Sequence, residues 1–366
     1  MVYLDNAATG FPKPREVTAA VGECIKKYCG NPGRSMHRLA RIAGEEVYAA
    51  REAVSRFFGA DDPEEVVFTL NATYALNTAI KTTIPDGGEV LISDLEHNAV
   101  YRPLKAEERR RGIKIRTFDT DGDIETNIRA ALTADTCAVV STLRSNVTGK
   151  EIPLAVLSKI AREKGLILIA DASQSAGHDR IDLAKTPCDI LCAPGHKGLL
   201  GIQGCGFAVF HDKRRRDSFI EGGSGSASAS PDMPDLLPER FEAGTLPTPA
   251  IVALRHGIEW IERYGIDHVH DRLQRLTEYA KESISQISEV SYCKGDGGIL
   301  SFRIRGEDPS LTAERLDRAG ICVRSGLHCA PLAHRKEGTL EGGTVRIGFS
   351  VFSREKDVDR LLHAIG

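Results

Sequence analysis

Short apolar runs alternate with longer amphipathic segments over the first two-thirds of this 366-residue chain. The predicted strands are 66–70, 89–93, 113–118, 137–142, 166–170, 189–193 and 206–210, and the predicted helices are 16–28, 39–58, 72–84, 100–111 and 154–164. Apolar runs of five or six residues separated by helices are typical of a mostly parallel sheet covered on both faces. Ligands of such α/β sheets bind beyond the carboxyl ends of the strands. The sequence therefore predicts an α/β fold with a site at one edge of its sheet.

The pattern changes after Pro249. Two long helical stretches, 251–264 and 266–287, lead into strands and a last helix over 355–365. Helices followed by a short sheet are typical of a separate α+β domain. We therefore predict a large domain over residues 15–247, and a smaller carboxyl-terminal α+β domain over 248–366 that also includes residues 1–14. Before the boundary, the Gly/Ser-rich stretch 221–231 is predicted to be a flexible loop, either a surface linker or a flap over a site.

Composition excludes several classes of protein. Lys and Arg total 48 and Asp and Glu total 51, a net charge of −3, which argues against a nucleic-acid or membrane-surface protein. No apolar run approaches the roughly 20 residues of a membrane span, and the first residues lack the basic start of a secretory signal. The nine cysteines are therefore expected to be reduced thiols in the cytoplasm. The basic run 213–216 is interpreted as a solvated turn, with a partner site as the alternative.

Two polar side chains follow predicted strands and suggest a chemistry. Lys197 lies in the turn Gly195-His196-Lys197-Gly198, and Asp171 directly follows the strand 166–170. Taken singly, they read as a surface lysine and a helix N-cap. Taken together at one sheet edge, they fit pyridoxal phosphate, which forms a Schiff base with a lysine and needs a carboxylate beside its pyridine nitrogen.

Seven motifs occur in order along the chain. They are Tyr3-Leu4-Asp5-Asn6-Ala7-Ala8-Thr9, Glu96-His97-Asn98, Ser145-Asn146-Val147-Thr148-Gly149, Asp171-Ala172-Ser173-Gln174, Gly195-His196-Lys197, Phe241-Glu242-Ala243-Gly244-Thr245 and Val323-Arg324-Ser325-Gly326-Leu327-His328-Cys329-Ala330-Pro331. Together they resemble the cysteine desulfurases of the Suf-like branch of the class V aminotransferase family. The resemblance implies the large and small domains of a fold-type I pyridoxal-phosphate enzyme.

The resemblance also implies how the cofactor ring is held. Lys197 would hold pyridoxal 5′-phosphate covalently, Asp171 would pair with the pyridinium nitrogen, and His97 would stack on the ring. Gln174 would hydrogen-bond the phenolic oxygen of the ring.

A second group of residues would bind the cofactor phosphate. Thr73, with Ala72, opens the helix after the first strand, and helix N-termini attract anions. His196 would also reach this phosphate. Thr245 resembles a residue that binds the phosphate in the neighbouring subunit, so the resemblance implies a homodimer.

Substrate binding is expected to involve the second domain. Arg346 would bind the amino-acid carboxylate through its planar fork. Asn146 would contact both ring and substrate, and Ala8 and Arg324 complete the predicted substrate site. Cys329 lies near cationic residues in sequence, which favour the thiolate form of a cysteine.

The implied reaction converts L-cysteine to L-alanine. Lys197 would act as the general base at the substrate Cα, with His97 as a further catalytic residue. Cys329 would attack the substrate sulfur, become a persulfide and pass the sulfur to a thiol or an acceptor protein. The resemblance connects this sulfur transfer with iron–sulfur cluster biogenesis.

Some positions depart from the Suf-like pattern, and other functions stay open. Hydroxyl residues are more usual where Pro194 and Ala72 stand, and the segment 335–338 after Cys329 is unusual. The alternatives are a selenocysteine lyase, a class V aminotransferase acting on another small amino acid, and a noncatalytic pyridoxal-phosphate protein. No metal ligand is predicted, because no pair of CxxC motifs occurs. The glycines at 201–206 do not match a dinucleotide-binding motif.

Overall fold

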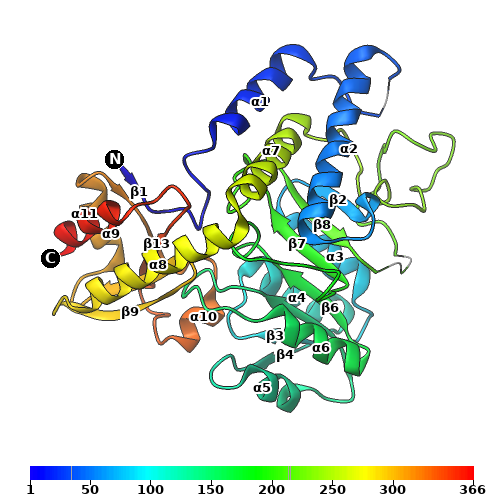
Figure 1. Ribbon diagram of the computed structural model, residues 1–366. Coiled ribbons are helices and arrows are strands. Elements are labelled where there is room, and N and C mark those ends of the chain that lie inside the picture. Colours follow the sequence, from blue (N-terminus) through cyan, green and yellow to red (C-terminus); the bar gives the residue numbers. More distant parts are fainter. Residues whose placement is uncertain (34, 213, 215) are drawn as a thin grey trace.

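The computed structural model describes residues 1–33, 35–212, 214 and 216–366. Its centre is a seven-stranded sheet of order β2-β8-β7-β6-β5-β3-β4 (Figure 1). The strands are β2 (Val66–Thr69), β3 (Glu89–Ser93), β4 (Lys114–Phe118), β5 (Thr136–Thr142), β6 (Ile167–Asp171), β7 (Ile190–Pro194) and β8 (Gly206–Phe210). Only β8 runs against its neighbours, and the β3–β4, β3–β5, β5–β6 and β6–β7 pairs are parallel. The predicted mostly parallel α/β sheet is confirmed.

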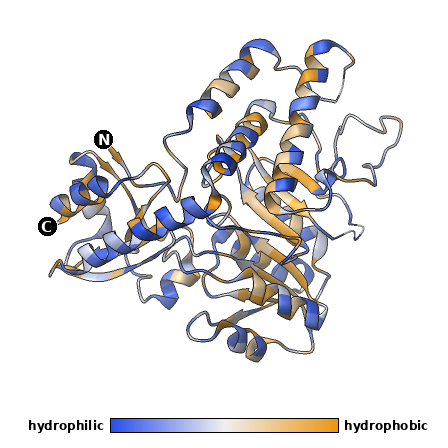
Figure 2. Cartoon of the chain, viewed as in Figure 1, coloured by the Kyte–Doolittle hydropathy of each residue, from blue (hydrophilic) through white to orange (hydrophobic). Residues whose placement is uncertain are grey.

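Helices cover both faces of this sheet. One face packs against α3 (Ala72–Thr83) and α4 (Asn98–Arg111), through alternate strand residues such as Val90, Val140 and Ile169. The residues between them, such as Leu91 and Val139, face the other layer. That layer contains α2 (Arg38–Phe58), α5 (Ile124–Ala131), α6 (Leu154–Lys164) and α7 (Thr248–Tyr264), and α1 (Arg15–Lys27) packs on α7. Burial on both faces explains why the inner strands are mostly apolar (Figure 2), whereas the edge strand β4 is largely exposed and contains Lys114 and Arg116.

A glycine lets the start of α3 approach the sheet. Gly206, the first residue of β8, pairs with both Thr69 and Pro194, the last residues of β2 and β7. A Cβ at this position would lie 2.5 Å from the backbone carbon of Asn71. Asn71 is the N-cap of α3 and accepts a hydrogen bond from the Tyr74 amide. The N-terminus of α3 therefore lies at the same sheet edge as the end of β7.

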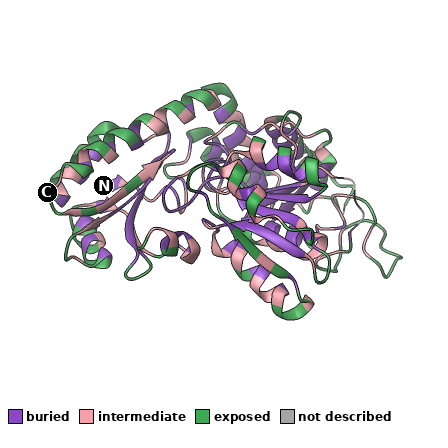
Figure 3. Cartoon of the chain, turned by 90° about the horizontal axis from the view of Figure 1, so that it is seen from below, coloured by how far each residue is buried: buried purple, intermediate pink, exposed green. Residues whose placement is uncertain are grey.

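A second sheet lies beside the first. It is antiparallel, with the order β12-β13-β10-β9. Its strands are β9 (Val290–Asp296), β10 (Ile299–Ile304), β12 (Arg324–Gly326) and β13 (Thr344–Gly348). The accompanying helices are α8 (Ile266–Ser285), α9 (Pro309–Arg318), α10 (Pro331–Lys336) and α11 (Glu355–Ile365). The outer surface of α8 is largely exposed, whereas β13 and most of β10 are buried (Figure 3).

The amino-terminal residues lie with this second sheet rather than with the first. β1 (Val2–Tyr3) pairs in parallel with β11 (Ile321–Cys322), and both chain ends lie near each other (Figure 1). α7 packs against α1 and α2, so the first helix of the predicted small domain contacts helices of the predicted large one. The division into domains at 247/248 stays a prediction.

Several smaller predictions concern the rest of the chain. The stretch 221–231 contains no helix or strand. Within the basic run, Lys213 and Arg215 lie outside the described residues, while Arg214 and Arg216 pair with acidic neighbours. The nine cysteines, all within the described part of the chain, form no disulfide there. Among the helices described, none combines the length and apolar character needed to cross a membrane.

Candidate active site

Polar residues follow five strand ends at one edge of the large sheet. His97 follows β3, Asn146 follows β5, Asp171 ends β6, Lys197 follows β7, and Thr73 is the second residue of α3 after β2. Since these strands run in the same direction, their carboxyl ends share an edge. The charge of Lys197 acts on both Asp171 and His97, so these three groups lie within electrostatic range of one another.

Lys197 lies in an environment that favours its neutral amine. The pKa of Lys197 is lowered to about 8, chiefly by burial and in part by the nearby charges of Arg346 and Arg324. Asp171 and Asp5 act in the opposite direction. A lysine with this pKa has a substantial neutral fraction near pH 8, which is what attack on an aldehyde requires.

The amino-terminal segment fixes the turn that carries Lys197. The backbone oxygen of His196 accepts hydrogen bonds from Gly10 N at 2.9 Å, Lys13 Nζ at 2.9 Å and Thr9 Oγ1 at 3.1 Å. The His196 ring also meets Thr9 Oγ1, at 3.1 Å from Nδ1. The sequence analysis gave no role to Lys13, because nothing in its neighbourhood along the chain points to residue 196.

Asp171 and Gln174 suit the polar edges of a pyridoxal ring. Asp171 is buried between β5 and β7, and its Oδ1 accepts a hydrogen bond of 2.9 Å from Ser173 N. Burial raises the pKa of Asp171, and the Lys197 charge opposes this shift. Gln174 donates to the Ala7 backbone oxygen at 3.0 Å, while its buried Oε1 has no hydrogen-bond partner among the described residues. A buried orphan amide oxygen and a carboxylate at one sheet edge fit the pyridoxal phosphate expected from the sequence.

His97 has a defined proton arrangement. It is the N-cap of α4, and its Nδ1 accepts a hydrogen bond of 3.0 Å from Ala99 N. Burial lowers the pKa of His97 to about 3, and the charges of Lys197 and Arg346 contribute in the same direction. With Nδ1 acting as an acceptor, we infer that the neutral ring carries its proton on Nε2. The His97 ring is therefore uncharged, and Nε2 is its one hydrogen-bond donor.

Arg346, in β13, is a buried cation that faces the first sheet. Its side chain is 1% exposed. Nη1 donates to the Asn146 backbone oxygen at 3.0 Å, and Nη2 lies 3.2 Å from Asp5 Oδ1. Nε has no partner among the described residues, and burial lowers the pKa of Arg346 to about 10. A guanidinium with an unused donor suits a carboxylate ligand. Asp5, which belongs to the first motif, was missed as its partner.

The loop that carries Cys329 is docked at this edge. Asn146 Nδ2 donates to the His328 backbone oxygen at 2.7 Å, and the Asn98 amide donates to the Cys329 oxygen at 2.7 Å. The φ angles of His328 and Cys329 are +47° and +59°, a left-handed region that costs non-glycine residues of order 1 kcal/mol each. Arg324 Nη2 lies 3.7 Å from Cys329 Sγ. The half-buried thiol thus lies beside a cation, on a loop held by the residues that flank His97 and β5.

The other predicted site residues, Thr73, Ala72, Ala8 and Thr245, make fewer contacts with the residues around Lys197. Thr73 is exposed at the start of α3, and Ala72 before it is buried. Ala8 lies in a turn, its amide donating to the Asp5 oxygen at 3.0 Å. Thr245 is exposed, and within the described residues no hydrogen bond joins its side chain to the others. Exposure of Thr245 is compatible with the predicted reach into a second subunit, which stays a prediction.

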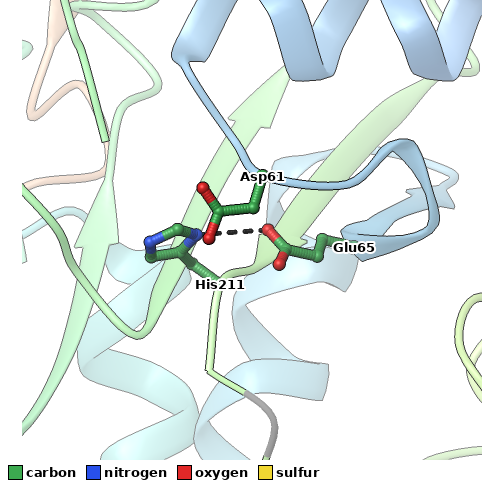
Figure 4. Close-up of side chains that lie close together, drawn as sticks. All are labelled: Asp61, Glu65 and His211. Atoms are coloured by element: carbon green, nitrogen blue, oxygen red, sulfur yellow. Dashed lines mark hydrogen bonds and ion pairs between the residues drawn. The ribbon is translucent and has the colours of Figure 1, made fainter. Parts of the chain in front are cut away.

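A second cluster of potential ligands lies at the opposite edge of the sheet. It consists of Asp61, Glu65 and His211, whose nearest ligand atoms lie within 4.8 Å of one another (Figure 4). Glu65 precedes β2 and His211 follows the reversed strand β8, so both are at the amino-terminal ends of the parallel strands. His211 Nδ1 is 3.2 Å from Glu65 Oε2, so the ring and the carboxylate bind each other. This cluster is separate from the Lys197 site.

Comparisons with known proteins agree on one family. A sequence model of "Aminotransferase class-V" matches residues 2–361. A protein of Methanothermobacter thermautotrophicus named "Probable cysteine desulfurase" is 33% identical over 98% of this chain and 92% of its own length. A cysteine desulfurase from Thermococcus onnurineus has a TM-score of 0.93 at 30% identity, covering 100% of this chain and 93% of that one. For the cysteine desulfurase CsdA of Escherichia coli, the TM-score is 0.89 at 25% identity, with 99% and 93% covered.

Proposed function

Because this chain belongs to the class V aminotransferase family, we propose that it is a pyridoxal-phosphate-dependent cysteine desulfurase. One observation carries the proposal. Asn146 contacts both the substrate-binding candidate Arg346 and the loop of the thiol Cys329, at the sheet edge where Lys197 lies. A transaminase needs no thiol at this position. The names of the relatives refer to cysteine, so the selenocysteine and other amino-acid alternatives are not favoured.

The cofactor supplies an electron sink conjugated with the substrate amino group. Lys197 would hold it, Asp171 would keep its ring nitrogen protonated, and the neutral His97 ring would contact it. Gln174 has a free amide oxygen for the hydroxyl of the ring. The phosphate is assigned to the N-terminus of α3, at Thr73 and Ala72, and to His196.

The residues of this chain bind the substrate and transfer its protons. Arg346 binds the substrate carboxylate, with Asn146, Ala8 and Arg324 around it. Lys197, with a pKa of about 8, accepts the proton from the substrate Cα and returns a proton as the product forms.

Cys329 takes the sulfur. Its thiolate forms an S–S bond with the substrate Sγ, and the substrate Cβ–Sγ bond breaks. The electron pair of that bond goes to Cβ, which gains a proton to give alanine. Arg324, 3.7 Å from Cys329 Sγ, stabilises the negative charge on the attacking sulfur. Cys329 then carries a persulfide for a thiol or an acceptor protein, a step that belongs to iron–sulfur cluster biogenesis.

The proposal extends to assembly and location. We place the enzyme in the cytoplasm, where its free cysteines stay reduced. It acts as a homodimer in which the exposed Thr245 binds the cofactor phosphate of the neighbouring subunit.

Alanine release from L-cysteine by the holoenzyme, with a thiol reductant, tests the proposal. Wild type should release alanine and sulfide, and both Cys329→Ala and Lys197→Ala should abolish the release. Cys29→Ala, which removes an exposed thiol outside the site, should leave it unchanged. Wild-type enzyme that binds the cofactor but releases no alanine would contradict the desulfurase assignment.

A further inference from the structure

A lysine bound by three aspartates joins the helix after Cys329 to the large sheet. Lys336, the last residue of α10, has a side chain only 11% exposed. Its Nζ lies 2.6 Å from Asp94 Oδ2 and 3.1 Å from Asp121 Oδ2, and it also binds Asp119. Asp94 directly follows β3, and the two other aspartates follow β4. One ammonium thus connects α10 to the carboxyl ends of two strands of the large sheet.

The aspartates are themselves held in place. Asp94 accepts a hydrogen bond of 2.7 Å from Thr120 Oγ1, which links the β3 and β4 ends. Asp121 Oδ1 is 2.8 Å from Lys150 Nζ. Lys336 therefore binds a preformed carboxylate group rather than a single flexible side chain.

The amino-terminal end of α10 follows almost directly after the loop that carries Cys329. Cys329 is separated from α10 by Ala330 alone, and Ala330 is fully buried. His328, buried before Cys329, meets Thr344 Oγ1 of β13 at 3.0 Å from its Nε2. Since α10 has six residues, Lys336 lies only seven positions after Cys329 along the chain.

Glu337, the residue after Lys336, binds the second sheet instead of the large one. Glu337 accepts an ion pair from Lys294 Nζ at 2.7 Å and a hydrogen bond from Tyr292 OH at 3.2 Å, both on β9 of the second sheet. Consecutive residues at the end of α10 therefore contact the two sheets separately. Of these two ion pairs, the one made by Lys336 crosses to the sheet that carries Lys197.

We propose that Lys336 is a positioning residue for Cys329, and that its ion pairs hold the left-handed loop at 328–329 against the large sheet. The inference rests on the proposed function only for the role of the thiol. Loss of the ion pairs lets the strained loop relax, so that Cys329 moves away from the substrate and becomes easier to reach from solvent. Asp94 is 18% exposed, whereas Asp119 and Asp121 are 64% and 68% exposed, so the pair of Lys336 with Asp94 is the one that salt screens least.

The test compares Lys336→Gln with the control Lys294→Gln, which removes the ion pair between Glu337 and the second sheet. The first readout is the rate at which iodoacetamide alkylates Cys329 without substrate, followed by peptide mass spectrometry. Lys336→Gln should raise this rate by about five- to thirty-fold, the factor that corresponds to one or two kcal/mol. Lys336→Arg should restore most of the wild-type rate, and Lys294→Gln should not change it.

The second readout is a single turnover of the holoenzyme with L-cysteine. Lys336→Gln should slow persulfide formation on Cys329, while cofactor absorbance and the KM for cysteine stay at wild-type values. Equal alkylation rates in wild type and Lys336→Gln, or equal increases in Lys336→Gln and Lys294→Gln, would overturn the inference. If Lys336→Gln does not fold, Asp119→Asn removes one carboxylate at the exposed end and should raise alkylation in the same direction. Alkylation needs no turnover, so this test is independent of alanine release by wild type.

Discussion

The Lys197 amine illustrates how one residue depends on several neighbours. Burial lowers its pKa, Arg346 and Arg324 contribute in the same sense, and Asp171 opposes them. These four groups come from β6, the turn after β7 and two strands of the second sheet. The reactivity of the lysine is therefore a property of the folded edge, and a peptide with the same local sequence would lack it.

Reductive labelling of the cofactor-free enzyme with a small aldehyde should show this property. The rate of labelling at Lys197 should rise with pH around a midpoint near 8, because the neutral amine is the reacting form. Exposed lysines of ordinary pKa, about 10.4, should still be gaining reactivity at that pH. Peptide mass spectrometry at each pH separates Lys197 from the other lysines.

Asp171→Asn supplies the control for this midpoint. The carboxylate raises the pKa of Lys197, so its removal should move the labelling midpoint below that of wild type. A wild-type midpoint above 10, or an upward shift in Asp171→Asn, is incompatible with the described environment.

The motifs identified candidate site residues, but they did not identify the partners that hold those residues. The first motif contains Asp5, yet its contact with Arg346 joins positions 341 apart. Lys13 is likewise far in sequence from the His196 oxygen that it binds. Such pairs depend on how β13 and the amino-terminal segment meet the large sheet, which no local pattern contains.

Elements were predicted more completely than contacts. The bounds of β3, β8, α6 and α11 agree with the sequence analysis, because each is a short apolar run or an amphipathic stretch with clear ends. α5 was missed, since its eight residues are too few to show a helical period. The order of the strands was not predicted, because the order is fixed by which helix crosses which face and not by the strand sequences.

A buried ion pair connects α2 to the segment of Thr245. Arg51 and Glu242 have side chains 7% and 6% exposed, and Nη1 lies 2.8 Å from Oε1. Glu242 also accepts from the Phe68 amide at 2.6 Å, which ties the segment to β2. Burial raises the pKa of Glu242, and the Arg51 charge opposes this shift.

Arg51→Met should destabilise the fold by about 3–5 kcal/mol at pH 7, because a buried carboxylate loses its partner. Without Arg51 the pKa of Glu242 rises further, and a group whose folded pKa is raised stabilises the fold only while it is protonated. The deficit should therefore shrink as the pH falls from 7 to 5. Urea unfolding of wild type and variant at several pH values measures both effects.

Matched variants distinguish the loss of the buried Arg51–Glu242 pair from the loss of a positive charge anywhere on α2. Arg56→Met, on the same helix, breaks a pair with Glu262 whose side chains are 55% and 30% exposed, and should cost less than about 1 kcal/mol. Arg51→Met with Glu242→Gln should recover part of the stability, since no buried charge remains. A deficit for Arg51→Met as small as that for Arg56→Met would argue against the pair as an anchor.

At the scale of the whole molecule, two surfaces point to a second copy of the chain. The first surface consists of exposed apolar side chains on and between α1 and α2. They are Ile25 of α1, Met36 between the two helices, and Leu39 and Tyr48 of α2. α1 and α2 stand together at the end of the molecule away from β9 (Figure 1). Thr245 is exposed on a segment that is rigidly attached to α2 through Arg51 and Glu242. A homodimer would cover the apolar residues and explain why a cofactor-binding candidate faces outward.

Mixing two inactive subunits tests whether Thr245 acts across this interface. Lys197→Ala removes the lysine of its own site, and Thr245→Val removes a hydroxyl that serves the neighbouring site. In a mixed dimer, the site that keeps Lys197 receives Thr245 from the Lys197→Ala subunit and is intact. After unfolding and refolding of an equal mixture at limiting cofactor, activity should reach about a quarter of wild type, since half of the dimers are mixed and each has one intact site. If Thr245 acted within its own chain, every lysine-bearing site would also carry the valine, and the mixture would show only the residual activity of Thr245→Val alone.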